Sequence, residues 1–141
     1  MEKLNLTQTW DKVFPQSDKV DHQKVTLFLI DGTAVPVRWE ENETVHELRT
    51  AAQNGTITVR STRYGGFEQV GSLPRRFSRN DVQTTTRPGD IVLYAGNQLV
   101  AFFGSNAWSY TRLGHIESLA PDELAALLDR PTVTIEIKYD G

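Results

Sequence analysis

The residues best suited to chemistry lie in two short stretches of the 141-residue chain, 64–69 and 108–112. In the first stretch, Tyr64, Phe67 and Glu68 surround a Gly-Gly pair, whose backbone freedom can aim neighbouring side chains at a cleft. Glu68 is the only carboxylate in these stretches, which makes it the candidate general acid or base; an apolar wall such as Phe67 would raise its pKa. Alternatively, the glycines form a turn and Glu68 is a surface partner of an arginine.

The second stretch brings Trp108, Tyr110 and Arg112 directly after an apolar run. We expect residues 104–114 to form a loop where the domain opens to solvent. Aromatic rings with a polar tip can line a half-apolar pocket, and a guanidinium can donate hydrogen bonds to a carboxylate or a peptide carbonyl bound there. Glu68 could hold Arg112 in place when no ligand is bound. Alternatively, the aromatic rings close one end of the domain and bind only backbone groups.

Several kinds of site are not expected from this sequence. The chain has no cysteine, which excludes disulfides and thiolate chemistry. His22, His46 and His115 lie far apart without short ligand spacing, so we expect neither a metal nor a cofactor. Ser105 and Ser109 lack a recognisable His-Asp relay, which argues against a serine nucleophile.

Charge and hydropathy narrow the expected partners. The formal net charge of −3 gives no broad basic face for nucleic acid, and Arg75, Arg76 and Arg79 are interpreted as solvated loop charges. No run approaches the ~20 apolar residues of a membrane helix, and the first residues lack the apolar stretch of a signal peptide, so we expect a cytoplasmic protein. A small molecule or a peptide is the expected partner; the oligomeric state is not indicated.

The chain has the length of one domain. Residues 1–23 are polar, without strand alternation or a helical stripe, and are interpreted as an N-terminal appendage to a domain at residues 24–141. Two β-rich runs flank the dipeptide Asp31-Gly32, which predicts a hairpin, and Pro36 must lie at an edge or bulge. A second hairpin is predicted around Gly96-Asn97, with strands apolar enough to be buried on both faces.

Two short helices are predicted among these strands. Thr44 and Glu47 form a capping-box pattern that predicts a helix at about residues 45–53. Pro121 precedes a leucine-rich segment that predicts a second helix at about residues 121–129. Many strands and few helices indicate a mostly-β fold, a small closed barrel plugged by helices at its ends.

Two longer stretches carry a family resemblance. They are YGGFEQVG at residues 64–71 and GDIVLYAGNQLVAFFGSNAWSYTRLGHI at residues 89–116. Together they resemble the bacterial cyclophilin-like family, over roughly residues 24–139. The resemblance implies a small β-barrel with two helices, and it implies much less about activity.

The chain departs from true cyclophilins in the residues of prolyl isomerisation. The Phe-His-Arg and Phe-Ser-Met-Ala-Asn motifs of those enzymes are absent, and the nearest equivalents are Arg60 or Arg63 and Trp108. Residues 6–26 also resemble the opening of a group of bacterial α/β-hydrolases, although the nucleophile-elbow motif G-x-S-x-G is absent.

Three functional hypotheses follow. The first is a binding domain whose cleft at the barrel end, lined by the candidate residues, holds a small acid or an extended peptide. The second is a peptidyl-prolyl isomerase-like enzyme, which needs an apolar slot and a donor such as Arg112 to stabilise the twisted amide. The third is an accessory module to a hydrolase.

Overall fold

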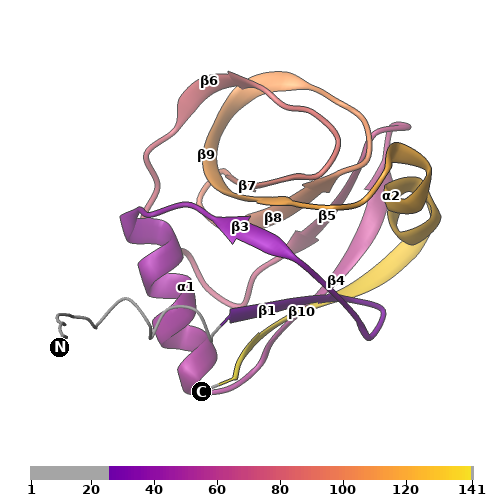
Figure 1. Cartoon of the computed structure of the whole chain (residues 1–141). Helices are drawn as coiled ribbons and strands as arrows, with labels where there is room; N and C mark the ends of the chain where they lie inside the picture. Colours follow the sequence, from indigo (N-terminus) through magenta and orange to yellow (C-terminus); the bar gives the residue numbers. More distant parts are fainter. Residues whose placement is uncertain (1–25, 141) are drawn as a thin grey trace, which may run out of the picture.

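A computed structural model describes residues 26–140, in which ten strands and two helices form a mostly-β, nearly closed barrel (Figure 1). The strands are β1 (Thr26–Ile30), β2 (Thr33–Val35), β3 (Val37–Trp39), β4 (Ile57–Tyr64), β5 (Glu68–Ser72), β6 (Val82–Thr85), β7 (Asp90–Tyr94), β8 (Gln98–Phe102), β9 (Ala107–Ile116) and β10 (Thr132–Tyr139); the helices are α1 (Glu43–Gln53) and α2 (Pro121–Leu128). The appendage expected at residues 1–23 lies outside the described residues.

The barrel closes through Pro36. The strand order is β2-β1-β10-β4-β5-β8-β7-β9-β3, and β6 pairs with β9 beside this path. β2 and β3 lie at opposite ends of the order, yet only Pro36 separates them in the chain. The sheet must therefore curl until its two ends meet, and the predicted interruption at Pro36, which has no N–H to give a ladder, is confirmed.

The predicted hairpins are both present. β1 and β2 pair in antiparallel register around Asp31 and Gly32, whose φ angles of 47° and 83° are those of a tight hairpin turn. β7 and β8 pair around the predicted Gly96-Asn97 turn. Alternate residues of these strands enter one apolar core, which includes Phe28, Ile30, Ile91, Leu93 and Leu99 together with Ile135 and Ile137 of β10.

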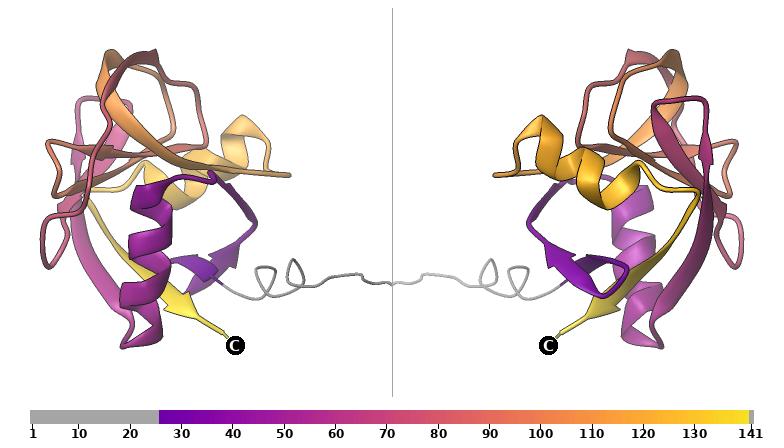
Figure 2. Two further views of the ribbon diagram at one scale, coloured as in Figure 1. Left: turned by 90° about the vertical axis from the view of Figure 1, so that its left-hand side faces the viewer. Right: turned by 90° about the vertical axis from the view of Figure 1, so that its right-hand side faces the viewer.

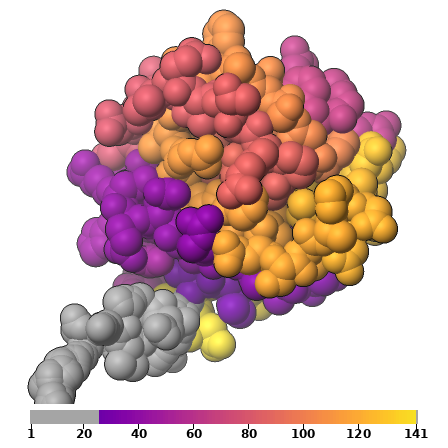
Figure 3. Space-filling model, turned by 45° about the horizontal axis from the view of Figure 1, so that its top comes forward, coloured from indigo at the N-terminus to yellow at the C-terminus, as the bar shows by residue number. Residues whose placement is uncertain are grey.

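The two helices lie against different parts of the barrel (Figure 2). α1 packs against β9 and β10 through Val45, Leu48 and Ala52. Figure 3 shows the purple residues of the α1 region and the gold residues of the α2 region on opposite sides of one face, with orange residues between them. Both predicted helices are confirmed within two residues of the expected ends.

The predicted capping box of α1 is wrong. Asn42 caps the helix, because its Oδ1 accepts from the Val45 amide at 2.9 Å. The Thr44 hydroxyl donates instead to the Ser78 carbonyl, and Glu47 accepts from the Ser78 amide at 2.9 Å. The side chains that resembled a cap therefore fasten α1 to the segment before β6.

β5 lacks the alternating apolar residues that predict a strand, and the reason lies in its two inward-facing residues. Gln69 is fully buried, and its Nε2 donates to the Leu128 and Arg130 carbonyls at 2.8 and 2.6 Å, so it satisfies the end of α2. A Cβ at Gly71 would lie 2.5 Å from Val59 Cγ1. An amide and a glycine thus replace the apolar residues that normally mark the inward face of a strand.

Candidate functional site

A second apolar cluster covers the outer face of the barrel wall. Val92, Val100, Phe102 and Tyr110 are buried there, apart from the core, with Phe67 and Val70 packed against them. They occupy the strand positions that alternate with core residues such as Leu93 and Leu99. The expectation that these strands are buried on both faces is confirmed.

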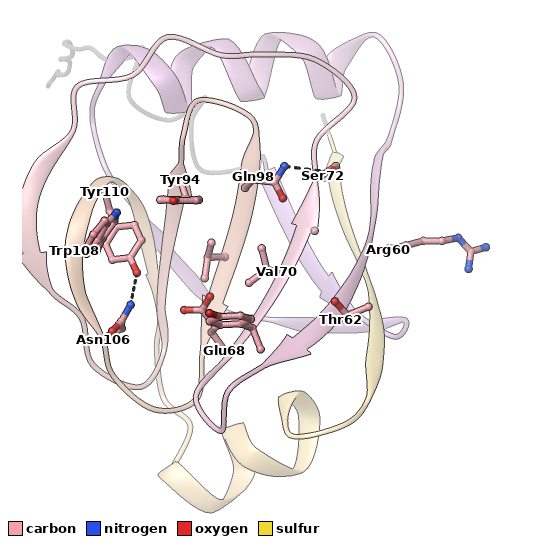
Figure 4. Close-up of a pocket in the computed structure, with 13 residues that line it drawn as sticks. Arg60, Thr62, Glu68, Val70, Ser72, Tyr94, Gln98, Asn106, Trp108 and Tyr110 are labelled. Carbon is pink, nitrogen blue, oxygen red and sulfur yellow. Dashed lines mark hydrogen bonds between the residues drawn. The ribbon is translucent and has the colours of Figure 1, made fainter.

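A cavity of about 700 Å³ lies beside this cluster (Figure 4). It is lined by Arg60, Thr62, Tyr64, Glu68, Val70, Gly71, Ser72, Tyr94, Gln98, Val100, Asn106, Trp108 and Tyr110. These residues belong to β4, β5, β7, β8 and β9 and to the segment before β9, and the strand residues mostly alternate with those of the core. The cavity therefore lies on the outer face of the wall and not at the barrel end.

Four of the six residues proposed from sequence line this cavity: Tyr64, Glu68, Trp108 and Tyr110. Backbone register brings the first two together, because Tyr64 lies opposite Glu68 in the β4–β5 pair. The other two reach the cavity from a strand. The loop expected at residues 104–114 is for the most part β9, whose residues Trp108 and Tyr110 lie opposite Thr84 and Val82 of β6.

Glu68 is the most unusual group of the cavity. Its side chain is 7% exposed, and its Oε1 is buried without a hydrogen-bond partner. Burial raises the pKa of this carboxyl from 4.5 to about 7, since the apolar surroundings disfavour the charged form. Phe102, which is fully buried, lies opposite it in the β5–β8 pair. A buried oxygen without a partner is costly to keep, and it is available to a ligand that donates a hydrogen bond.

Aromatic side chains form the wall opposite Glu68. In the view of Figure 4, the Glu68 carboxyl lies between Trp108 and Tyr110 on one side and Val70 and Thr62 on the other. Tyr110 is buried and packs edge-to-face against Tyr94, with ring centroids 6.1 Å apart. Its hydroxyl accepts from Asn106 Nδ2 at 2.8 Å. Burial raises the pKa of Tyr110, so its hydroxyl remains protonated at neutral pH.

Phe67 is not among the cavity-lining residues. Its ring packs against the outer cluster and makes an edge contact with Tyr64, with centroids 6.0 Å apart. Its carbonyl accepts from the Phe103 and Gly104 amides at 3.0 and 2.9 Å. Phe67 therefore supports the residues around the cavity and holds the β4–β5 turn against β8.

Arg112 also lies away from this cavity, and the expected pairing with Glu68 is wrong. Its Nη2 lies 3.3 Å from Asp90 Oδ2, and it lines a second cavity of about 800 Å³ beside α1 and β6. Asp90 is buried and its Oδ1 lies 2.7 Å from His115 Nδ1. Burial would raise the pKa of Asp90, but hydrogen bonds from the Arg87 amide, His115 and Arg112 outweigh it and lower that pKa.

Several cavity residues escaped the sequence interpretation. Tyr94, Asn106 and Gln98 line the cavity but lie outside the two stretches that were singled out. Gln98 Nε2 donates to Ser72 Oγ at 3.2 Å across the β5–β8 pair. The available signal for Tyr94 and Gln98 was strand alternation, because both share the outward face with Val92 and Val100; Asn106 lies outside the strands and had no such signal.

The comparisons agree with this architecture. A model of the cyclophilin-like family matches residues 28–138, which includes every cavity-lining residue. The chain belongs to the cyclophilin-like family. No match was found among curated proteins. In this family member, residues 26–140 contain no helix long and apolar enough to cross a membrane, and no group of three or more His, Asp or Glu side chains placed to hold a metal ion.

Proposed function

We propose that this cyclophilin-like domain binds a small molecule, or the side chain of an extended peptide, in the outer-face cavity. The observation that carries the proposal is the buried Glu68 oxygen without a partner in a cavity of ligand-accommodating volume, about 700 Å³. The apolar floor and aromatic walls supply binding area, and the few polar groups would orient the ligand.

Exposed aromatic surface at the cavity rim supports the same proposal. Trp108 and Tyr64 are 54% and 64% exposed, and both line the cavity together with the buried Val100 and Tyr110. Large aromatic side chains exposed at the edge of a concave site are typical of binding surfaces. The acid ligand expected from sequence depended on Arg112, which is paired with Asp90 beside another cavity, so this cavity lacks the guanidinium that would bind an acid.

A thermal-shift screen of the full chain against metabolites and short peptides tests the proposal, with Trp108→Ala and Tyr139→Ala as a matched pair. Both residues are exposed aromatics, but only Trp108 lines the cavity. Compounds that bind in the cavity should stabilise the wild type and Tyr139→Ala and should stabilise Trp108→Ala much less. Equal stabilisation of both variants, or no hit in any compound class, would contradict the proposal.

Prolyl isomerisation is a second candidate, favoured by one observation. Arg60 and Trp108, the nearest equivalents of the cyclophilin arginine and tryptophan, line the same cavity. The Arg60 guanidinium points away from it in Figure 4, so this activity requires Arg60 to swing inward over the substrate. In a protease-coupled assay on X-Pro peptides, the rate of cis–trans isomerisation should rise in proportion to protein concentration, and Arg60→Ala should abolish this increase. An isomerisation rate no faster than the uncatalysed one rules the activity out.

The accessory role beside a hydrolase depends on residues 6–26, nearly all of which lie outside the described residues, and it stays a prediction.

A further inference from the structure

Few charged side chains line the cavity, and the buried one is acidic. Glu68 is the only carboxyl among the described residues that line it, and Arg60 is the only base. Glu68 is buried at the centre of the cavity, whereas Arg60 is exposed, four residues from Tyr64 along β4 and directed outward. A ligand inside the cavity therefore meets one acidic group and no cation of the protein.

The aromatic side chains of the cavity also favour a positively charged ligand. Tyr64, Tyr94, Trp108 and Tyr110 line the cavity around Glu68. The faces of such rings carry negative potential and attract cations, most strongly where water is excluded. A carboxyl surrounded by aromatic rings is the arrangement that suits an alkylammonium group, because the carboxylate supplies the counter-ion and the rings stabilise the attached carbons.

We propose that the ligand of this cavity is an organic cation, an ammonium group on an apolar or aromatic body, with the Glu68 carboxylate as its counter-ion. This inference rests on the proposed binding function and names the ligand class. A buried carboxylate is stabilised by an opposite charge that hydrogen-bonds to it, and the unpartnered Oε1 is the atom that would accept the ammonium hydrogen. Carboxylic acids are disfavoured at the same position, since two carboxylates repel each other in a site of low polarity.

The inference implies a dependence on pH. The other titratable side chains that line the cavity are Arg60 and Tyr64 on β4, Tyr94 on β7 and Tyr110 on β9. With a pKa of about 7, Glu68 is mostly ionised at pH 8 and mostly protonated at pH 6. An ammonium ligand needs the ionised form, so its affinity should fall roughly tenfold from pH 8 to pH 6.

Matched compounds on the full chain test this. Each of several arylalkyl skeletons carries an ammonium, a hydroxyl or a carboxylate; the first triplet is phenethylammonium, 2-phenylethanol and 3-phenylpropanoate. Binding is measured by two-dimensional NMR at pH 6 and pH 8, which also reports which residues respond. The ammonium members should bind about tenfold or more tighter than the alcohols at pH 8, lose affinity at pH 6, and shift the Glu68 and Trp108 resonances.

Glu68→Gln and Glu136→Gln serve as the matched variants, because Glu136 on β10 does not line the cavity. Glu68→Gln should weaken the ammonium compounds at pH 8 by roughly tenfold and remove their pH dependence, whereas Glu136→Gln should change neither. If alcohols or carboxylates bind in the cavity as tightly as the ammonium compounds, or if Glu68→Gln binds ammonium like the wild type, the inference is wrong while the binding function stands. If no member of any triplet shifts a cavity residue, both are overturned.

Discussion

The buried carboxyl of Glu68 makes a quantitative prediction about stability. In the unfolded chain this group titrates near 4.5, but in the folded domain its pKa is raised to about 7. Between these values the folded state holds a proton that the unfolded state has lost, so stability falls as pH rises through this window. Below pH 4.5 the group is neutral in both states; above pH 7 the full penalty applies.

The size of the effect follows from the shift. Each pKa unit corresponds to ~1.4 kcal/mol, so a rise from 4.5 to about 7 corresponds to at most ~3.5 kcal/mol. The cavity is open to solvent on one side, which screens the charge, so we expect ~1–3 kcal/mol. Glu68→Gln keeps the shape and carries no titratable proton. It should match the wild type near pH 4 and exceed its stability by ~1–3 kcal/mol at pH 8.

Urea unfolding followed by tryptophan fluorescence, at half-unit steps from pH 4 to pH 8.5, measures both curves. Glu47→Gln is the control, because hydrogen bonds from the Ser78 hydroxyl and amide lower the pKa of Glu47. Glu47 therefore stabilises the wild type above the pKa that this group has in the unfolded chain. This stabilisation is lost as pH falls through its pKa in the folded domain, so Glu47→Gln should destabilise the domain most at high pH. A difference between wild type and Glu68→Gln that is flat with pH, or a destabilised Glu68→Gln at pH 8, would refute the account of Glu68.

Three further predictions concern the fold. Arg112→Ala should lower the free energy of unfolding by ~1–3 kcal/mol in the same urea titration, because it removes a hydrogen-bond donor from the buried Asp90. Arg38→Ala is the control: it breaks an exposed ion pair and should change the free energy of unfolding by less than ~1 kcal/mol. Gly65→Ala should lower the melting temperature by several degrees in a calorimetric scan, since the φ of Gly65 is 61° and a Cβ there would lie 2.3 Å from the Phe67 ring. Gly66→Ala should lower it less, because a Cβ at Gly66 meets nothing within 4 Å. Deleting the N-terminal appendage should leave the melting temperature within a few degrees, and a loss of cooperative unfolding would show that it belongs to the domain.

Local patterns were enough to predict much of the barrel. Asp31-Gly32 marks a hairpin because few dipeptides accept two positive φ angles in succession, and the structure has that turn. Pro36 predicts an interruption wherever it lies in a ladder. Strands with one apolar face, such as β10, follow from alternation alone, since Val133, Ile135 and Ile137 enter the core.

β5, β6 and β9 were missed for reasons that single-sequence patterns do not reveal. β5 has Gln69 and Gly71 on its inward face. Gln69 hydrogen-bonds to the end of α2, and Gly71 leaves room for β4 to pass close by, so both residues are explained only by their tertiary neighbours. β6 has no strong apolar alternation, and its pairing with β9 holds it in place. Strand formation there is a property of the partner as much as of the segment.

Local sequence patterns were enough to identify the residue types of the candidate site, the hairpins, the helices and the family likeness. Which of those side chains meet depends on the tertiary fold. The curvature of the wall turns outward-facing residues of five strands toward one cavity, buries Glu68 there, and leaves Arg112 beside Asp90 instead. Distance along the chain carries no information about these encounters, because pairing register and sheet curvature set them. The pKa of Glu68 depends on the apolar atoms that surround it, and those come from strands far apart in the sequence.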